Sequence, residues 1–389
     1  MAAGNRAQIK HELLVWGRQM SGMPPSVAAK KIGITEERLK DWEEGKIKPT
    51  IKQLRTLANV YKQSFAAFFL REAPSVPKLP LKDYRRLPGA TSHEVSHEII
   101  MDVRNALDRR LITLDLMQLN GIEIDKFSYQ GSISEGVDVL SKRIRSDLDV
   151  TIAEQLKLRD PNKGFRYWRE ALEDLGVLVF QSSTIDIGDM RGYSVYDDYL
   201  PIIVVNRKDA EAARIFTMLH ELVHIYLRAS GLCDLEARTD IPPEEQRLEQ
   251  FCNDVAANTL VPKEHFTNSE ILLTNDNNVW SDIEISSLAK EYCVSREMIA
   301  RRLVEVGRAD KVFYRDKREQ YLDEYKKQKA SKSGGFVPPA TDVLSKGGRK
   351  FSGLVIQSLK SKKINSTQAS ELLGVKLKHL VKISASLGY

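Results

Sequence analysis

The spacing of apolar residues predicts that most of the chain is helical. Within residues 1–72, positions such as Leu13 and Trp16 begin an apolar stripe of helical spacing. Gly33 stands where a tight turn between two helices needs a permissive backbone, and Thr35 suits the N-cap of the helix that follows. This pattern predicts a helix-turn-helix domain at the start of the chain.

Strand signals are confined to the middle of the chain. Residues 192–207 are rich in β-branched and aromatic side chains, and Asp197-Asp198 is typical of a turn between strands, so we expect a small antiparallel sheet. The helix after this sheet should begin near Asn206, a good N-cap residue, and should end near Gly231.

Changes in composition divide the chain after residue 72 into three segments. Residues 73–93 are rich in proline and predict a linker. Residues 94–310 predict lead-in helices followed by the core that contains the sheet. Residues 311–389 predict a basic, helical C-terminal module with Gly374 at a turn between two helices.

The net charge of +6 is distributed unevenly. Residues 1–80 carry 14 basic and 7 acidic side chains, residues 81–300 carry 25 and 38, and residues 301–389 carry 20 and 8. Basic ends around an acidic middle indicate that an end contacts a polyanion such as DNA, although lysine-rich ends can also serve solubility alone.

The cysteine content and the hydropathy of the chain restrict its surroundings. Three scattered cysteines, Cys233, Cys252 and Cys293, do not form a disulfide framework, which favours a reducing, cytoplasmic compartment. No apolar run approaches the ~20 residues needed to cross a bilayer, so we expect no membrane contact.

The segment His220-Glu221-Leu222-Val223-His224 carries the strongest chemical signal. Residues four apart stack on one face of a helix, so both imidazoles can bind one Zn²⁺ ion. Glu221 points beside that metal, where it can act as the catalytic base. Two incidental histidines on a surface helix are the alternative, but the apolar flanks predict a buried helix, in which unpaired polar groups are costly.

A catalytic zinc ion needs a third protein ligand. Glu249 is the best candidate, because it lies in a second predicted helix that can run antiparallel to the first. Glu244 and Glu245 are rivals, but they follow two prolines at the expected helix start. Asn253, one turn after Glu249, is expected to orient a ligand imidazole.

Amide hydrolysis also needs a donor for the oxyanion that forms in the transition state. The candidates are Tyr193, Tyr226 and His265, and the sequence does not choose among them. Residues 192–205 could form an edge strand to which an extended substrate adds by main-chain pairing, although ordinary sheet packing is an equal alternative.

Two segments together resemble the ImmA/IrrE family of metallopeptidases: PIIVVN, nine residues and FTMLHELVHIYL, followed by RLEQFCNDVAANTLVP. The N-terminal part resembles the XRE-type helix-turn-helix that is fused to many members. The resemblance covers roughly residues 10–305. It departs at Cys252 and Val255, where the family more often has Ala and Phe.

The resemblance implies a mostly helical α+β protein with a zincin-like core of the gluzincin type. It implies that His220, His224 and Glu249 bind zinc and that Glu221 is the base. It further implies a site-specific endopeptidase that cleaves a repressor-type protein and thereby switches transcription in a stress response or in a mobile element. The alternatives are a DNA-binding regulator with a non-catalytic zinc site and a component of a toxin–antitoxin-type module.

The residues of the predicted DNA-reading helix leave its partner open. Among residues 35–46, Arg38, Lys40 and Lys46 could contact DNA or a protein, but five acidic residues accompany them. A net negative helix is unfavourable beside phosphates, so docking onto a repressor of similar fold is the alternative to DNA binding. The oligomeric state does not follow from the sequence.

Overall fold

The computed structural model describes residues 5–76, 82–83, 96–229, 231–233, 242–331 and 337–389. Its internal contacts divide the chain into two compact units, residues 1–79 with 91–105 and residues 80–90 with 106–389. The division falls inside one long helix, α5 (His97–Asn120). Most of the linker predicted at 73–93 lies outside the described residues. The second unit continues past residue 310, so the expected boundary between the core and a C-terminal module stays a prediction.

The first unit is a bundle of short helices, as its apolar spacing predicts. Gly33 ends one helix in the left-handed conformation, and the Thr35 hydroxyl caps the next by accepting a hydrogen bond from the Arg38 N–H at 3.2 Å. The helix-turn-helix prediction is therefore confirmed at its turn. The elements are α1 (Glu12–Ser21), α2 (Pro25–Ile32), α3 (Glu36–Glu43), α4 (Ile51–Tyr61) and the 3-10 helix η1 (Phe65–Phe69).

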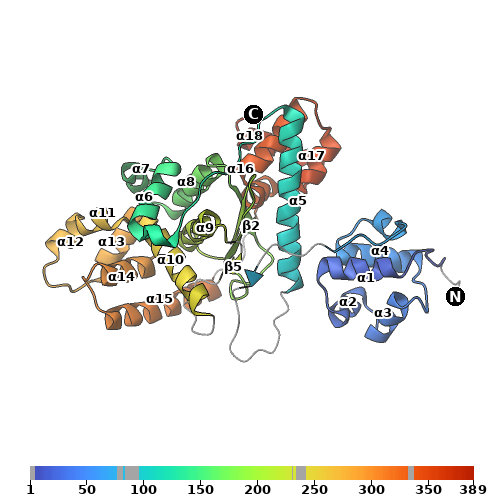
Figure 1. Ribbon diagram of the computed structural model, residues 1–389, viewed down its shortest axis with the longest axis horizontal. Coiled ribbons are helices and arrows are strands. Elements are labelled where there is room, and N and C mark those ends of the chain that lie inside the picture. The colour runs from blue at the N-terminus through green and yellow to red at the C-terminus, as the bar shows by residue number, and fades with distance from the viewer. Residues whose placement is uncertain (1–4, 77–81, 84–95, 230, 234–241, 332–336) are drawn as a thin grey trace. The chain divides into compact units, whose positions relative to one another are not determined.

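The second unit combines many helices with one sheet, so the mostly helical α+β class is confirmed (Figure 1). No helix of the described residues is long and apolar enough to span a membrane. The helices are η2 (Ile133–Glu135), α6 (Val137–Asp147), α7 (Ile152–Leu158), α8 (Pro161–Asp174), α9 (Glu211–Tyr226), α10 (Pro243–Leu260), α11 (Lys263–Thr267), α12 (Glu270–Thr274), α13 (Asp282–Tyr292), α14 (Arg296–Glu305), α15 (Lys311–Ser331), α16 (Pro339–Lys360), α17 (Ser366–Leu373), η3 (Leu377–His379) and α18 (Leu380–Ser386).

The sheet is mixed, so the expectation of an antiparallel sheet is wrong in part. Its strand order is β1-β5-β3-β4-β2, in which β3 runs antiparallel to both neighbours while β2 runs parallel to β4. Because β3 and β4 each have a strand on both sides, neither is an edge strand, and of the two alternatives for residues 192–205 ordinary sheet packing is the one observed. The strands are β1 (Lys82–Asp83), β2 (Leu178–Ser182), β3 (Gly192–Val195), β4 (Ile202–Asn206) and β5 (Gly231–Cys233).

Helix α9 packs against β3 and β4 and is flanked by α8 and α10 (Figure 1). It begins at Glu211 with Ala210 as N-cap, so the predicted start near Asn206 is wrong. Asn206 instead ends β4, where its side-chain amide donates to the carbonyls of Ile185 and Met190 at 3.1 and 2.8 Å. Strand pairing with β2 up to the last residue has overridden the capping preference of this asparagine.

The C-terminal segment docks on the edge of this sheet, because α16 packs along β2 (Figure 1). Helix α16 is kinked at Gly348, whose φ is 79° and ψ 167°. At the kink, the buried Arg169 donates to the Ser345 carbonyl at 2.8 Å, and Glu173 accepts from the Lys350 N–H at 3.1 Å. Side chains from α8 thus hold the C-terminal helices on the core.

We expect Gly348→Ala to destabilise the second unit by about 3–5 kcal/mol. The backbone conformation at this position is essentially restricted to glycine, which costs about 1–3 kcal/mol for another residue. A Cβ would also overlap Glu173 Oε1 and lie 2.8 Å from an Arg169 nitrogen, and overpacking of this kind costs a further ~1–3 kcal/mol.

Urea unfolding followed by circular dichroism measures this loss. Gly374→Ala is the matched control, because Gly374 has a φ of 64° but nothing within 4 Å of its added Cβ. The control should cost only about 1 kcal/mol. Equal losses in the two variants would contradict a role for the contacts around Gly348.

Candidate metal centre

Helix α9 carries three polar side chains into the interior of the second unit. His220, Glu221 and His224 are all fully buried, within a helix whose remaining buried residues are mainly apolar. The two histidines are four residues apart and therefore lie on one face of the helix, as their spacing predicts. Their rings are in edge contact, with centroids 4.8 Å apart.

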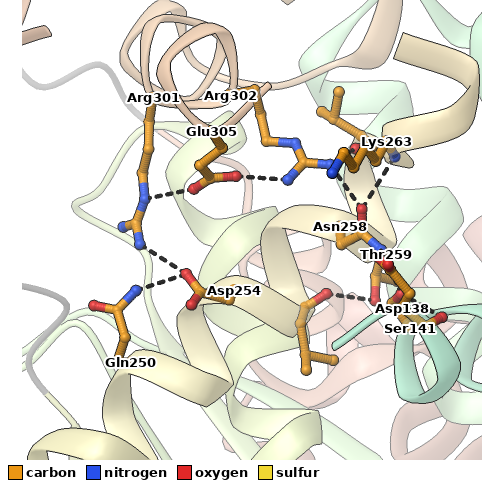
Figure 2. Close-up of polar contacts among 12 residues, drawn as sticks. Asp138, Ser141, Gln250, Asp254, Asn258, Thr259, Lys263, Arg301, Arg302 and Glu305 are labelled. Atoms are coloured by element: carbon orange, nitrogen blue, oxygen red, sulfur yellow. Dashed lines mark hydrogen bonds and ion pairs between the residues drawn. The ribbon is translucent and has the colours of Figure 1, made fainter. Parts of the chain in front are cut away.

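Helix α10 brings the third member of the site and is fixed by a polar network at its C-terminal end (Figure 2). Asn258 on α10 donates to Ser141 Oγ at 2.7 Å and to Asp138 Oδ1 at 3.0 Å, both on α6. The buried Arg302 of α14 donates to Asn258 Oδ1 at 2.7 Å, and Arg301 reaches Asp254 at 3.0 Å. These bonds fix the rotation and position of α10, and so the direction of Glu249.

The carboxylate of Glu249 meets both imidazoles. His220 Nε2 and His224 Nε2 are 3.1 Å apart, and they lie 3.3 and 3.4 Å from the two oxygens of Glu249. The structure therefore brings the three predicted ligands together. The rivals Glu244 and Glu245 lie in the first turn of α10, away from this cluster.

The donor set fits a zinc ion. Ligand atoms at ~2.0–2.1 Å from a tetrahedral Zn²⁺ ion lie ~3.3–3.4 Å from one another, which is close to the three separations in this cluster. His220 Nδ1 has no hydrogen-bond partner among the described residues, whereas its Nε2 faces His224 and Glu249. Two nitrogens and one carboxylate leave a fourth position open, as in catalytic rather than structural zinc sites.

The charge of Glu249 depends on the histidines. Burial by itself would raise the pKa of Glu249, but the hydrogen bonds and charges of His220 and His224 hold this pKa well below its usual range. Glu249 is therefore ionised at neutral pH. By contrast, burial and the nearby charges of Glu249 and Glu221 raise the pKa of the Cys252 thiol, which keeps this thiol protonated.

Two residues beside Glu221 were missed by the sequence analysis. Gly192, at the start of β3, lies so close to α9 that a Cβ there would overlap Thr217 and lie 3.3 Å from Glu221 Oε1. Ser194 is two residues further along, on the same face of the strand, and its buried hydroxyl has no hydrogen-bond partner among the described residues. No local pattern identifies either residue, because both depend on where β3 crosses α9.

The three candidate oxyanion donors have different surroundings. Tyr226 donates its hydroxyl to Asp147 at 2.8 Å, and His265 Nδ1 is 2.7 Å from the Tyr292 hydroxyl, so these two groups are engaged elsewhere. Tyr193 is buried on β3, but its side chain alternates with Gly192 and so faces away from α9. The geometry therefore favours none of the three as the donor.

Asn253 lies one turn after Glu249, and its side-chain oxygen is buried without a hydrogen-bond partner among the described residues. Among the described residues, no hydrogen bond joins Asn253 to His220 or His224. Instead it lines a pocket with Phe216, whose ring contacts that of His220 at 6.3 Å between centroids. The other pocket residues come mainly from α14 and α15: Arg191, Ala213, Ser295, Glu297, Met298, Arg301, Tyr314, Arg318 and Leu322.

The candidate contacts of the first unit lie on α3 and just after it. Lys46 pairs with Glu44 at 2.6 Å, and Lys40 lies 3.7 Å from the same carboxylate. Both lysines therefore have a carboxylate of their own segment beside them, whereas Arg38 has no ion pair among the described residues.

Two family models match the chain. Residues 172–304 match a peptidase family described as the IrrE N-terminal-like domain, and residues 16–68 match a helix-turn-helix family. The first match contains His220, Glu221, His224 and Glu249, so the resemblance stated from the sequence is confirmed. A search of curated proteins gave no match, and a search of solved structures also gave none.

Proposed function

We propose that the chain, which carries an IrrE N-terminal-like peptidase domain and a helix-turn-helix domain, is a zinc-dependent endopeptidase of the gluzincin type. The observation that carries this proposal is the convergence of His220, His224 and Glu249 within 3.1–3.4 Å of one another, next to Glu221 on the same buried helix. A structural zinc site would use four protein ligands and would need no additional buried carboxylate.

The chemistry follows from these positions. When bound, zinc acts as a Lewis acid and makes water nucleophilic near neutral pH. Glu221 accepts the proton of the attacking water and later transfers it to the leaving amine. Because Gly192 has no side chain, β3 can lie close to α9, and this limits the space around Glu221 Oε1. Glu249 keeps its negative charge beside the two imidazoles.

We further propose that the substrate enters along the pocket between α9, α14 and α15. Phe216 and Asn253 join this pocket to the metal centre, and the Asn253 oxygen can accept a hydrogen bond from a substrate main-chain N–H. Because β3 and β4 are paired on both sides, an extended substrate cannot add to either strand by main-chain pairing. The pocket runs beyond the residues of the family match, since α15 lines it.

The substrate class comes from the family alone. We propose a repressor-type regulatory protein, whose cleavage switches transcription in a stress or mobile-element response. The helix-turn-helix match supports a role near DNA, either by direct binding or by docking onto a repressor of similar fold. We propose a cytoplasmic location, and a partner protein that masks the metal centre is the alternative form of regulation.

Metal analysis of the purified protein tests the proposal. We expect one zinc ion per wild-type chain and less than about a tenth of that in His224→Ala, because two remaining ligands hold zinc weakly. Incubation of each protein with the repressor encoded beside its gene should give a discrete fragment with wild type only. A wild type that holds no zinc, or a His224→Ala variant that cleaves as fast as wild type, would refute the peptidase.

A further inference from the structure

The last helices of the second unit form a strongly basic surface that the peptidase function does not use. Residues 343–389 contain nine basic side chains and a single acidic one, Glu371. Lys350 is tied to Glu173, and Lys346 and Arg349 lie near Asp342 and Glu170. The remaining six are exposed: Lys360, Lys362, Lys363, Lys376, Lys378 and Lys382.

These lysines belong to a second helix-turn-helix. Helix α17 ends at Gly374, which adopts the left-handed conformation with a φ of 64°, and η3 and α18 follow at once. The inner faces of the two helices pack on α16, and η3 contacts both of them; the buried apolar residues are Ala369, Leu373, Leu380 and Ile383. Figure 1 shows α16, α17 and α18 gathered at one end of the second unit.

The solvent side of η3 and of the second helix, α18, combines cations with apolar groups. Lys378 of η3 and Lys382 of α18 are exposed, and so are Leu377 of η3 and Val381 of α18, at 53% and 76%. A face that served only solubility would have no reason to expose two aliphatic side chains among lysines. In a helix that reads the major groove, lysines bind phosphates or guanine and aliphatic groups contact thymine methyls.

The ammonium groups on this surface are available to a partner. Those of Lys362, Lys363, Lys376, Lys378 and Lys382 have no ion pair or hydrogen bond within the part of the chain that the structure describes. The ammonium group of Lys360 lies over the ring of Tyr389. Lys362 and Lys363 precede α17, the first helix of the motif, which in such motifs crosses the phosphate backbone. Lys376 and Lys378 lie at the start of η3 and within it, and Lys382 lies in α18.

Helix α3 of the first unit lacks this complementarity to DNA. This corresponding second helix has the sequence EERLKDWE, and the cations Lys40 and Lys46 pair with Glu44. Phosphates surround a helix in the major groove on both sides, so an acidic helix is repelled there. The charges of the C-terminal motif therefore fit a polyanion such as DNA, whereas those of α3 do not.

We propose that the C-terminal helix-turn-helix of residues 361–386 is the duplex DNA-binding surface of this protein. The inference is independent of the proposed catalytic function. Because α16 fixes this motif on β2 through Arg169, Glu173 and Gln181, DNA bound there is held in a defined position relative to the peptidase centre.

Binding of the full-length chain to a fluorescein-labelled DNA duplex of mixed sequence, measured by anisotropy over a range of salt concentrations, tests this proposal. We expect Lys378→Glu/Lys382→Glu to weaken binding about tenfold or more and to reduce the slope of log affinity against log salt by about 2. The matched control Lys157→Glu/Lys290→Glu makes the same charge change at exposed lysines of α7 and α13 and should shift affinity less than about twofold.

Three outcomes would overturn the proposal. One is an equal loss in the control variant, which would mean that overall positive charge attracts the DNA. Another is loss of binding in Arg38→Glu/Lys40→Glu together with full binding in Lys378→Glu/Lys382→Glu, which would assign the DNA to the first unit. The third is a wild-type chain that ignores the duplex but binds phosphatidylglycerol vesicles at the same salt.

Discussion

Replacing Glu221 with glutamine is expected to lower the rate of substrate cleavage by about 10²–10⁴-fold, the range that a positioned general acid–base group contributes. The zinc content of this variant should equal that of the wild type, because the proposed ligand atoms belong to His220, His224 and Glu249. Glutamine has nearly the same shape as glutamate and fits beside Gly192, but it cannot accept the proton of the attacking water.

The loss must be separated from a general disturbance of α9. Glu211→Gln provides the control, because Glu211 lies in the first turn of the same helix and pairs with Arg214 at 2.7 Å, outside the metal centre. This control should cleave at nearly the wild-type rate. A Glu221→Gln variant that retains more than about a tenth of wild-type activity would remove Glu221 from the role of base.

The convergence of His220, His224 and Glu249 was the part of the candidate site that the sequence predicted best. His220 and His224 needed only the geometry of one helix, and Glu249 needed only that a second helix packs antiparallel against it. Helical geometry could also have excluded Tyr226, which is two residues past His224 and so points to another side of α9. Its hydroxyl donates a hydrogen bond to Asp147.

Features that depend on long-range contacts were not predicted. The closeness of Gly192 to Glu221 depends on where β3 crosses α9, and no neighbouring residue signals it. The parallel pairing of β2 with β4 was missed because a short apolar run has the same pattern in parallel and antiparallel sheets. Asn206 suited a helix cap by residue type, but pairing with β2 kept it in the sheet.

Exchange of Glu249 for glutamine is expected to lower zinc affinity by about 100-fold or more, since even groups that only support metal ligands change affinity by about 10–100-fold. The carboxylate faces both imidazole Nε2 atoms at 3.3 and 3.4 Å, and its side chain is only 13% exposed. An amide in its place supplies a neutral and weaker ligand oxygen. Mass spectrometry of the bound metal after dialysis at neutral pH measures the change.

The variant Glu244→Gln separates ligation from the general charge of α10. Glu244 is exposed in the first turn of the same helix and makes the same change from carboxylate to amide, so this variant should retain its zinc. Melting curves give an independent readout, because a ligand that binds only the folded state raises its stability. A chelator should therefore lower the melting temperature of wild type and Glu244→Gln but leave that of Glu249→Gln nearly unchanged. If Glu244→Gln loses the metal while Glu249→Gln keeps it, the third ligand comes from the start of α10, and Glu249 is a buried partner of the two histidines only.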